Sequence, residues 1–172
     1  KDSKLILNSL LVLIPKKSNK KFKKSFDSIS VLLSRYFAGL ILQIFILFII
    51  YTILLLIIGT PNAIVIAFLC SLLNLIPFIG PFIGGILMIL LTMSSHITQD
   101  FSTVILAKAI YVAIGFAIGQ LIDNFFSQPF IFSNSVRSHP LEIFIVIISG
   151  GLLFGAIGMI AAVPSYTALK VI

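Results

Sequence analysis

Charged residues are scarce in this sequence, and their scarcity limits the class of protein first. Only 10% of the residues are Asp, Glu, Lys or Arg, against roughly 25% in a typical soluble domain. None of these four residue types occurs between Arg35 and Asp100. Hydrophobic residues make up 59% of the chain, which leaves too little polar surface for a protein that faces water on all sides. The sequence therefore predicts an all-α, polytopic integral membrane protein.

Cysteine and histidine are also rare, which removes several kinds of chemistry. Cys70 is the only cysteine, so no disulfide can form within the chain. The two histidines have no Cys, Asp or Glu at zinc-ligand spacing, and no Gly-Lys-Ser/Thr loop is present to hold phosphate. Ser149 with His139 invites comparison with intramembrane serine proteases, but Ile147 stands where that class has glycine. We therefore expect no enzyme activity, no cofactor and no metal site.

The positive charge that is present lies at one end of the chain. Residues 1–35 contain nine Lys and Arg against Asp2 and Asp27, so they carry the whole net charge of +7. This distribution follows the positive-inside rule and places residues 1–35 on the cytoplasmic side, next to anionic lipid headgroups. Because stacking platforms and base-reading elements are missing, we expect no nucleic-acid partner. The division predicted is a basic cytoplasmic or interfacial segment, 1–35, and a transmembrane domain, 36–172.

Residues 16–36 have the pattern of an amphipathic helix. Their large apolar residues recur at i, i+4, i+7, i+11 and i+14, which is one helical face, and Lys, Arg and Ser fill the other positions. A basic amphipathic helix next to a span is typical of one that lies on the membrane surface. The alternative is a solvated helix that packs on another domain. The apolar face consists of Phe22, Phe26, Ile29, Leu33 and Tyr36.

Two apolar runs have the length of simple transmembrane spans. The first covers residues 38–58, has Gln43 as its main polar residue, and stops at the Gly-Thr-Pro-Asn sequence 59–62. The second covers residues 104–122. A bilayer core of about 30 Å requires about 20 residues of helix, which both runs approach.

Two other apolar runs are interrupted by proline and glycine. A continuous helix over residues 63–93 would be about 46 Å long, too long for one span, and Pro77-Phe78-Ile79-Gly80-Pro81 divides it. The run 141–169 contains Ser149-Gly150-Gly151 and later Pro164. We predict that both runs are hairpins, re-entrant or fully crossing, with these motifs at their bends. Paired, interrupted apolar segments are typical of the substrate path of transporters.

The orientation of the other segments follows from residues 1–35 lying inside. The loop 94–103 is then outside and residues 123–140 are cytoplasmic, whether or not the hairpins cross fully. Lys108 is the exception to the charge rule, and it is close enough to a span end to extend its ammonium to the interface. We expect His96, in the outer loop, to be a surface residue.

Polar residues near the spans are the candidates for a transport path, because they are expensive in a membrane. Gln120, Asp123 and Asn124 lie at i, i+3 and i+4 and share a helical face, where they could bind a cation or carry a proton. The alternative is an ordinary charge at a helix end. Asn74, before Pro77, either braces the bend or lines a path.

A second polar group lies where the last apolar run begins. Arg137, His139 and Glu142 flank Pro140, and His139 titrates near physiological pH in an unperturbed setting. The group could gate a proton-coupled movement, or it could cap the helix that follows.

Small residues four apart allow helix backbones to approach closely in lipid. They support tight packing, and a homo-oligomer is a reasonable expectation. Three such pairs occur: Gly80/Gly84, Gly115/Gly119 and Gly151/Gly155.

Three motifs in order resemble the autoinducer-2 exporter (PerM-like permease) family. The first resembles the family signature NLIPxIGPxIG, and the second joins a Gln-Leu-Ile-Asp-Asn sequence to a later Pro and His-Pro-Leu. The third is rich in glycine and ends in Ala-Val-Pro. The motifs are Asn74–Gly84; Gln120–Asn124 with Pro129 and His139–Leu141; and Gly150–Met159, which includes Gly158, with Ala162–Pro164.

The resemblance covers about residues 10–170 and implies the C-terminal part of a bacterial inner-membrane protein with about eight membrane segments. The first segments are then missing from this chain, which begins at Lys1 without Met. Members are described as exporters of autoinducer-2 or as sodium(lithium)/proton antiporters, and many have Glu at the position of Asp123. We expect a secondary transporter of a small polar solute or signalling molecule. The alternatives are a sodium(lithium)/proton antiporter and a membrane scaffold that transports nothing.

Overall fold

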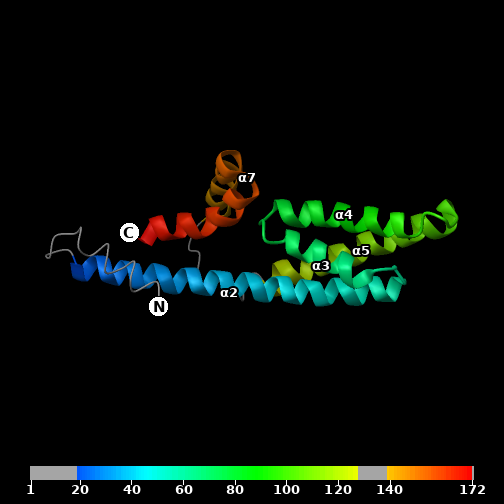
Figure 1. The fold of residues 1–172 in the computed structure, drawn as a ribbon, viewed down its shortest axis with the longest axis horizontal. Coiled ribbons are helices and arrows are strands. Elements are labelled where there is room, and N and C mark those ends of the chain that lie inside the picture. Colours follow the sequence, from blue (N-terminus) through cyan, green and yellow to red (C-terminus); the bar gives the residue numbers. More distant parts are fainter. Residues whose placement is uncertain (1–18, 128–138, 172) are drawn as a thin grey trace.

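The protein is a set of apolar helices, several of them joined by tight turns. The computed structural model describes residues 19–127 and 139–171, and every regular element in these ranges is helical (Figure 1). Three stretches are long and apolar enough to cross a membrane: Asp27–Ile58, Phe101–Phe125 and Leu141–Lys170. The predicted all-α membrane class is confirmed.

Helix α2 (Asn19–Ile58) is longer than the predicted span. Its 40 residues form one helix of about 60 Å. The predicted amphipathic segment 16–36 and the predicted span 38–58 therefore belong to one element within the described residues. No proline occurs between Pro15 and Pro61, so no residue in this stretch removes a helical hydrogen bond. A position of the amphipathic part on the membrane surface stays a prediction.

The predicted stop after the first span is confirmed. Helix α2 ends at Ile58, and α3 (Ala63–Leu73) begins after a corner of four residues. Gly59 and Asn62 have φ values of 72° and 57°, in the left-handed region that Gly and Asn enter most readily. The corner reverses the chain, so α3 packs back along α2.

Helices α3 and α4 (Ile79–Ser95) form the first predicted hairpin. The turn between them contains Pro77, and Phe78 adopts a φ of 65°, which is unusual for a bulky residue. A Cβ atom at Gly80 would collide with the carbonyl oxygen of Leu73, so only glycine allows the turn to close. The predicted bend at residues 77–81 is therefore confirmed.

The two arms of this hairpin are short. The 11 residues of α3 and the 17 of α4 correspond to about 17 Å and about 26 Å, both less than a bilayer core of about 30 Å. A Cβ at Gly84 would lie 3.1 Å from the carbonyl oxygen of Cys70, which shows how closely the arms approach. Pro81 stands in the first turn of α4, where a missing N–H disrupts little.

The second predicted span is a composite helix. It consists of a π-helical turn, η1 (Phe101–Ile105), the α-helix α5 (Leu106–Ile122) and a second π-helical turn, η2 (Asp123–Ser127). Asp100 caps η1: its carboxylate accepts hydrogen bonds from the backbone N–H and the hydroxyl of Thr103, both at 2.8 Å. These hydrogen bonds hold the pKa of Asp100 below its usual value.

Helix α7 (Pro140–Val171) contains the second predicted hairpin, but the bend is not at residues 149–151. Those residues are helical, and the chain reverses at Gly155, with φ 62° and ψ −146°. Gly150 serves a different purpose, because a Cβ at Gly158 would collide with its carbonyl oxygen. Glycine is needed at Gly150 and Gly158 because the backbones of the two arms touch there, and at Gly155 because φ is positive.

The end of α7 packs on the amphipathic part of α2. A small apolar groove between them is lined by Ile29, Leu33 and Tyr36 from α2 and by Pro164 and Ala168 from α7. The predicted apolar face of the segment is therefore partly covered by protein. The other two residues of that face are Phe22 and Phe26, whose side chains lie outside the described part of the structure.

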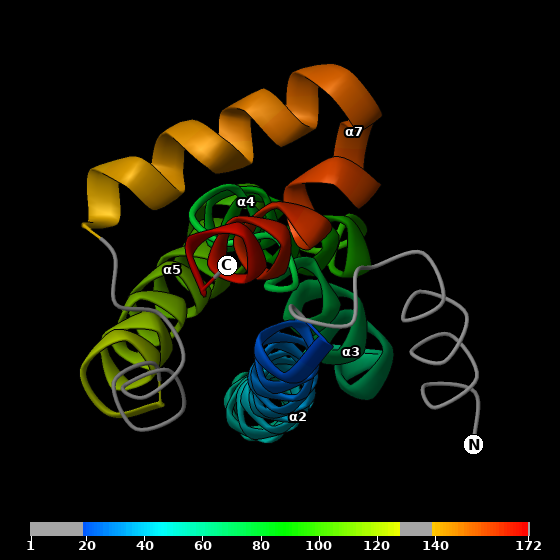
Figure 2. The same ribbon diagram turned by 90° about the vertical axis from the view of Figure 1, so that its left-hand side faces the viewer.

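The buried residues form two apolar clusters along α2. The larger joins α2 to α3, α4 and α5, and the smaller joins α2 to α7. In Figure 2, where α2 is seen nearly end-on, the first arm of α7 runs crosswise to it. The smaller cluster consists of Tyr36, Leu40, Ile147, Ala162 and Val163.

Candidate functional site

One face of α2 is buried and packs against the other helices. Its residues recur every three or four positions, as one face of a helix requires, and all are at most 5% exposed. The first two belong to the cluster with α7, and the last three to the cluster with α3, α4 and α5. Gln43 lies between the clusters as a polar residue. The face consists of Tyr36, Leu40, Gln43, Leu47, Tyr51 and Leu55.

Gln43 and Asp123 form a buried polar pair. The Asp123 side chain is completely buried, and its Oδ2 atom accepts a hydrogen bond of 2.7 Å from Nε2 of Gln43. A charged carboxylate in an apolar membrane interior costs on the order of 3 kcal/mol by insertion scales, so such residues are kept mainly for function. The amide dipole of Gln43 offsets part of this cost.

A second chain of hydrogen bonds connects three helices beside this pair. The Nε2 atom of Gln120 donates to the hydroxyl of Tyr51 at 2.6 Å and to Oδ1 of Asn74 at 3.2 Å. Asn74 in turn donates to the carbonyl oxygen of Cys70, which fixes its amide at the end of α3. The ring of Tyr51 stacks on Phe116, with centroids 5.2 Å apart. The chain therefore links α2, the tip of the first hairpin and α5.

The cluster supplies oxygen atoms and one carboxylate within an otherwise apolar bundle. Carboxylate and amide oxygens suit hard cations and solutes that donate hydrogen bonds. A carboxylate that can be protonated also suits proton transfer. We call Gln43, Tyr51, Asn74, Gln120 and Asp123 the polar cluster.

The sequence identified three of these five residues. The structure brings Asn74, Gln120 and Asp123 into this part of the bundle, whereas Asn124 is exposed. Gln120 is in α5 and Asp123 begins η2, where a wider turn replaces the α-helical register. Gln43 and Tyr51 were not among the predicted site residues. The available signal for Gln43 was its position as the main polar residue in an apolar span.

A different polar group closes the opposite end of the bundle. His96 is only 3% exposed, so the expectation that it is a surface residue is wrong. Its Nδ1 lies 2.9 Å from the carbonyl oxygen of Thr92 and must donate there, which leaves Nε2 to accept from the ammonium of Lys108 at 2.8 Å. Lys108 also donates to the carbonyl oxygen of Gly59 at 3.2 Å. The group ties α5 and the end of α4 to the corner after α2.

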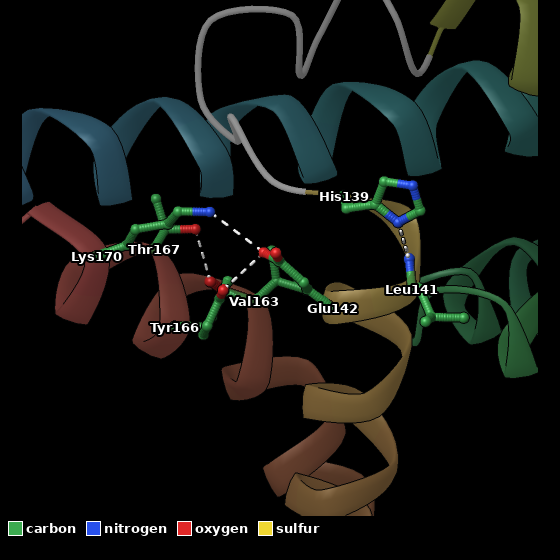
Figure 3. Close-up of polar contacts among 7 residues, drawn as sticks. All are labelled: His139, Leu141, Glu142, Val163, Tyr166, Thr167 and Lys170. Atoms are coloured by element: carbon green, nitrogen blue, oxygen red, sulfur yellow. Dashed lines mark hydrogen bonds and ion pairs between the residues drawn. The ribbon is translucent and has the colours of Figure 1, made fainter.

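Of the predicted polar group at the start of α7, Glu142 forms a clasp with Tyr166 and Lys170 at the base of that hairpin (Figure 3). Oε2 of Glu142 accepts from the hydroxyl of Tyr166 at 2.8 Å and from the ammonium of Lys170 at 3.2 Å. His139 is exposed, and its Nδ1 accepts from the backbone N–H of Leu141 at 3.3 Å, so it caps the helix. The predicted partner Arg137 lies outside the described residues.

Within residues 19–127 and 139–171, no three His, Cys, Asp or Glu side chains come together as a metal site would require. Asp123 is the only acidic residue of the polar cluster. An ion bound there would have to take its remaining ligands from amides, the tyrosine hydroxyl, backbone or water.

Comparison with known proteins identifies the family. The sequence model of the family described as "AI-2E family transporter" matches residues 1–172. "Putative transport protein YrrI" of Bacillus subtilis (strain 168) is 30% identical over 171 residues, which cover 99% of this chain and 46% of that protein. "Putative transport protein YueF" of the same strain is 31% identical over 151 residues, which cover 86% of this chain and 37% of that protein.

The chain thus spans less than half the length of these two relatives. No solved structure matches it. Because the family model matches the whole chain, the chain belongs to the AI-2E transporter family.

Proposed function

We propose that the full-length protein is a secondary transporter of the bacterial inner membrane that moves a small polar solute, with the polar cluster on its path. The observation that carries this proposal is the complete burial of Asp123 and its hydrogen bond from Gln43. A buried carboxylate in a membrane domain is costly, which supports a functional role for Asp123.

The arrangement of the hairpin supports this assignment. Asn74 ends α3 and belongs both to the turn and to the polar cluster, so a movement of the hairpin alters the cluster directly. Broken helices that meet polar groups are the usual construction of substrate sites in secondary transporters. A homo-oligomer of the full-length protein is part of the proposal.

A sodium(lithium)/proton antiporter is the second candidate. Asp123 favours it, since a carboxylate can alternate between a proton and a monovalent cation. The transported species therefore distinguishes the candidates: dependence on sodium or lithium supports the antiporter, and movement of an organic solute without such dependence supports the first proposal. A scaffold would show neither.

The test is a flux measurement on full-length protein in proteoliposomes. Wild type is compared with Asp123→Asn, first for proton movement driven by sodium or lithium, then for uptake of labelled small polar solutes, autoinducer-2 included. We expect the Asp123→Asn variant to lose most of the wild-type flux, because an amide can neither carry the charge nor exchange a proton.

Asp100→Asn is the matched control, since it makes the same chemical change at an exposed loop residue that caps η1. Its flux should stay near that of wild type. Equal fluxes in wild type and Asp123→Asn would remove the polar cluster from the path. A folded wild type that moves none of the tested species would favour the scaffold.

A further inference from the structure

The two hairpins touch at one point, between the turn of the first and the first arm of the second. Phe78, in the turn, meets Phe144 of α7 edge to face, with ring centroids 5.8 Å apart. Beside this contact, Leu75 packs against the cluster that contains Ile147 of α7 together with Tyr36 and Leu40 of α2. The first arm of α7 therefore lies against the tip of the first hairpin.

This contact lies immediately beside the polar cluster. Leu75 follows Asn74 in the chain, and Leu40 precedes Gln43 by about one turn on the same face of α2. On the other side of Gln43, Leu47 and Tyr51 pack against α3, α4 and α5. Helix α7 therefore covers the side of the polar cluster that faces the N-terminal end of α2.

The hairpin in α7 is built as one unit. Its arms touch backbone to backbone at Gly150 and Gly158, and the clasp of Glu142, Tyr166 and Lys170 joins them at the base. The tip, by contrast, is exposed, with Leu152 and Ile157 at 84% and 78% exposure. The second arm packs on α2 through Ala162 and Val163, and the first arm meets the turn of the first hairpin through Phe144. An element that is closed on itself in this way can pivot on its second arm without unfolding.

We infer that α7 is a gate, which pivots as a unit away from Phe78 and Leu75 and so opens the polar cluster toward the N-terminal end of α2. In the closed position the aromatic contact and the small cluster exclude water from Asp123. Opening separates Phe144 from Phe78 and leaves the clasp intact. The gate serves transport, so this inference rests on the proposed function.

The test is to join the gate to the hairpin and measure transport. In full-length protein with Cys70→Ala and any other native cysteine replaced, Phe78→Cys and Phe144→Cys are combined and bridged with a short reagent that reacts with two thiols and is released by reduction. We expect flux to fall to that of protein-free vesicles after bridging, and to return after reduction.

The matched control bridges Glu142→Cys to Tyr166→Cys within α7. This bridge replaces the clasp by a covalent link, so the flux of this double variant should be the same before and after bridging. Undiminished flux after the Phe78–Phe144 positions are joined would overturn the gate, and leave the proposed transport function standing.

A spin-label distance measurement tests whether α7 moves, and it needs no transport assay. Labels at Ile157 on the exposed tip of α7 and at Ile118 on the exposed side of α5 report the distance between them in lipid nanodiscs. A moving gate predicts two distance populations whose ratio changes in Asp123→Asn. A single narrow population in both proteins would overturn the gate, even if no transported species were found.

Discussion

At the scale of single residues, Gln43 occupies an unusual position for a polar side chain. It stands between apolar residues on a buried face of α2, and its amide donates to a carboxylate 80 positions away in the sequence. In water such a hydrogen bond would contribute little. Inside the bundle, a buried acceptor that loses its donor retains the full cost of desolvation.

We predict that Gln43→Leu destabilises the protein by about 1–3 kcal/mol, because Asp123 stays buried and loses this donor. The measurement is the thermal unfolding midpoint in detergent. Gln99→Leu is the control, since Gln99 is exposed in the loop before η1 and the substitution is the same. Equal midpoints in the two variants would show that the hydrogen bond contributes nothing to stability.

His96 and Lys108, at the other end of the bundle, also form a contact that the sequence did not predict. Lys108 was expected to extend toward the interface, and it reaches the carbonyl oxygen of Gly59 and Nε2 of His96. The sequence supplies two basic residues 12 positions apart, but their contact arises only because the η1 turn and α5 fold back against the end of α4.

At the scale of elements, glycines of identical spacing have different roles. A Cβ at Gly80 would collide with a backbone carbonyl of Leu73, which cannot move without opening the turn. The three atoms nearest to a Cβ at Gly115 all belong to the side chain of Leu54, which is flexible and lies on α2. The GxxxG pattern alone does not separate the two cases.

Gly80→Ala should therefore be much more damaging than Gly115→Ala. For Gly115→Ala we expect a loss of about 1–3 kcal/mol, typical of overpacking that side chains can absorb. For Gly80→Ala we expect a failure of the α3–α4 hairpin to close. Yield of monodisperse protein and the unfolding midpoint provide the readouts, and an equal loss in both variants would contradict the prediction.

The same reasoning explains where the second hairpin bends. The sequence motif Ser149-Gly150-Gly151 predicted a bend, but a bend needs a residue with positive φ, and Gly155 provides it. Gly150 then lies opposite Gly158 in the other arm, where its small size is used for contact. Composition can show that a run of glycines has a structural purpose without showing which glycine turns the chain.

At the scale of the whole molecule, the charge distribution predicts the orientation in the membrane. The basic residues precede the apolar part of α2, and the loop before η1 lies at the opposite end of the bundle. The positive-inside rule then places Ser34 in the cytoplasm and Gln99 outside.

We predict that Gln99→Cys reacts with a membrane-impermeant maleimide on intact cells, whereas Ser34→Cys reacts only after the cells are opened. Both side chains are exposed in the structure, so a difference in labelling reports the side of the membrane. The background is full-length protein without other cysteines. The reverse pattern would invert the orientation, and with it the side on which α7 opens.

The membrane class, the stop at residues 59–62 and the presence of two hairpins follow from the amino-acid sequence alone, because they depend on local properties: apolar length, missing charge and helix-breaking residues. The sequence also singled out Asn74, Gln120 and Asp123 as candidates, because polar residues stand out in apolar runs. Only the tertiary structure paired Gln43 with Asp123, buried His96 and placed α7 against the first hairpin. These are contacts between distant segments, and helical periodicity states which face a residue occupies, but not which helix will cover it.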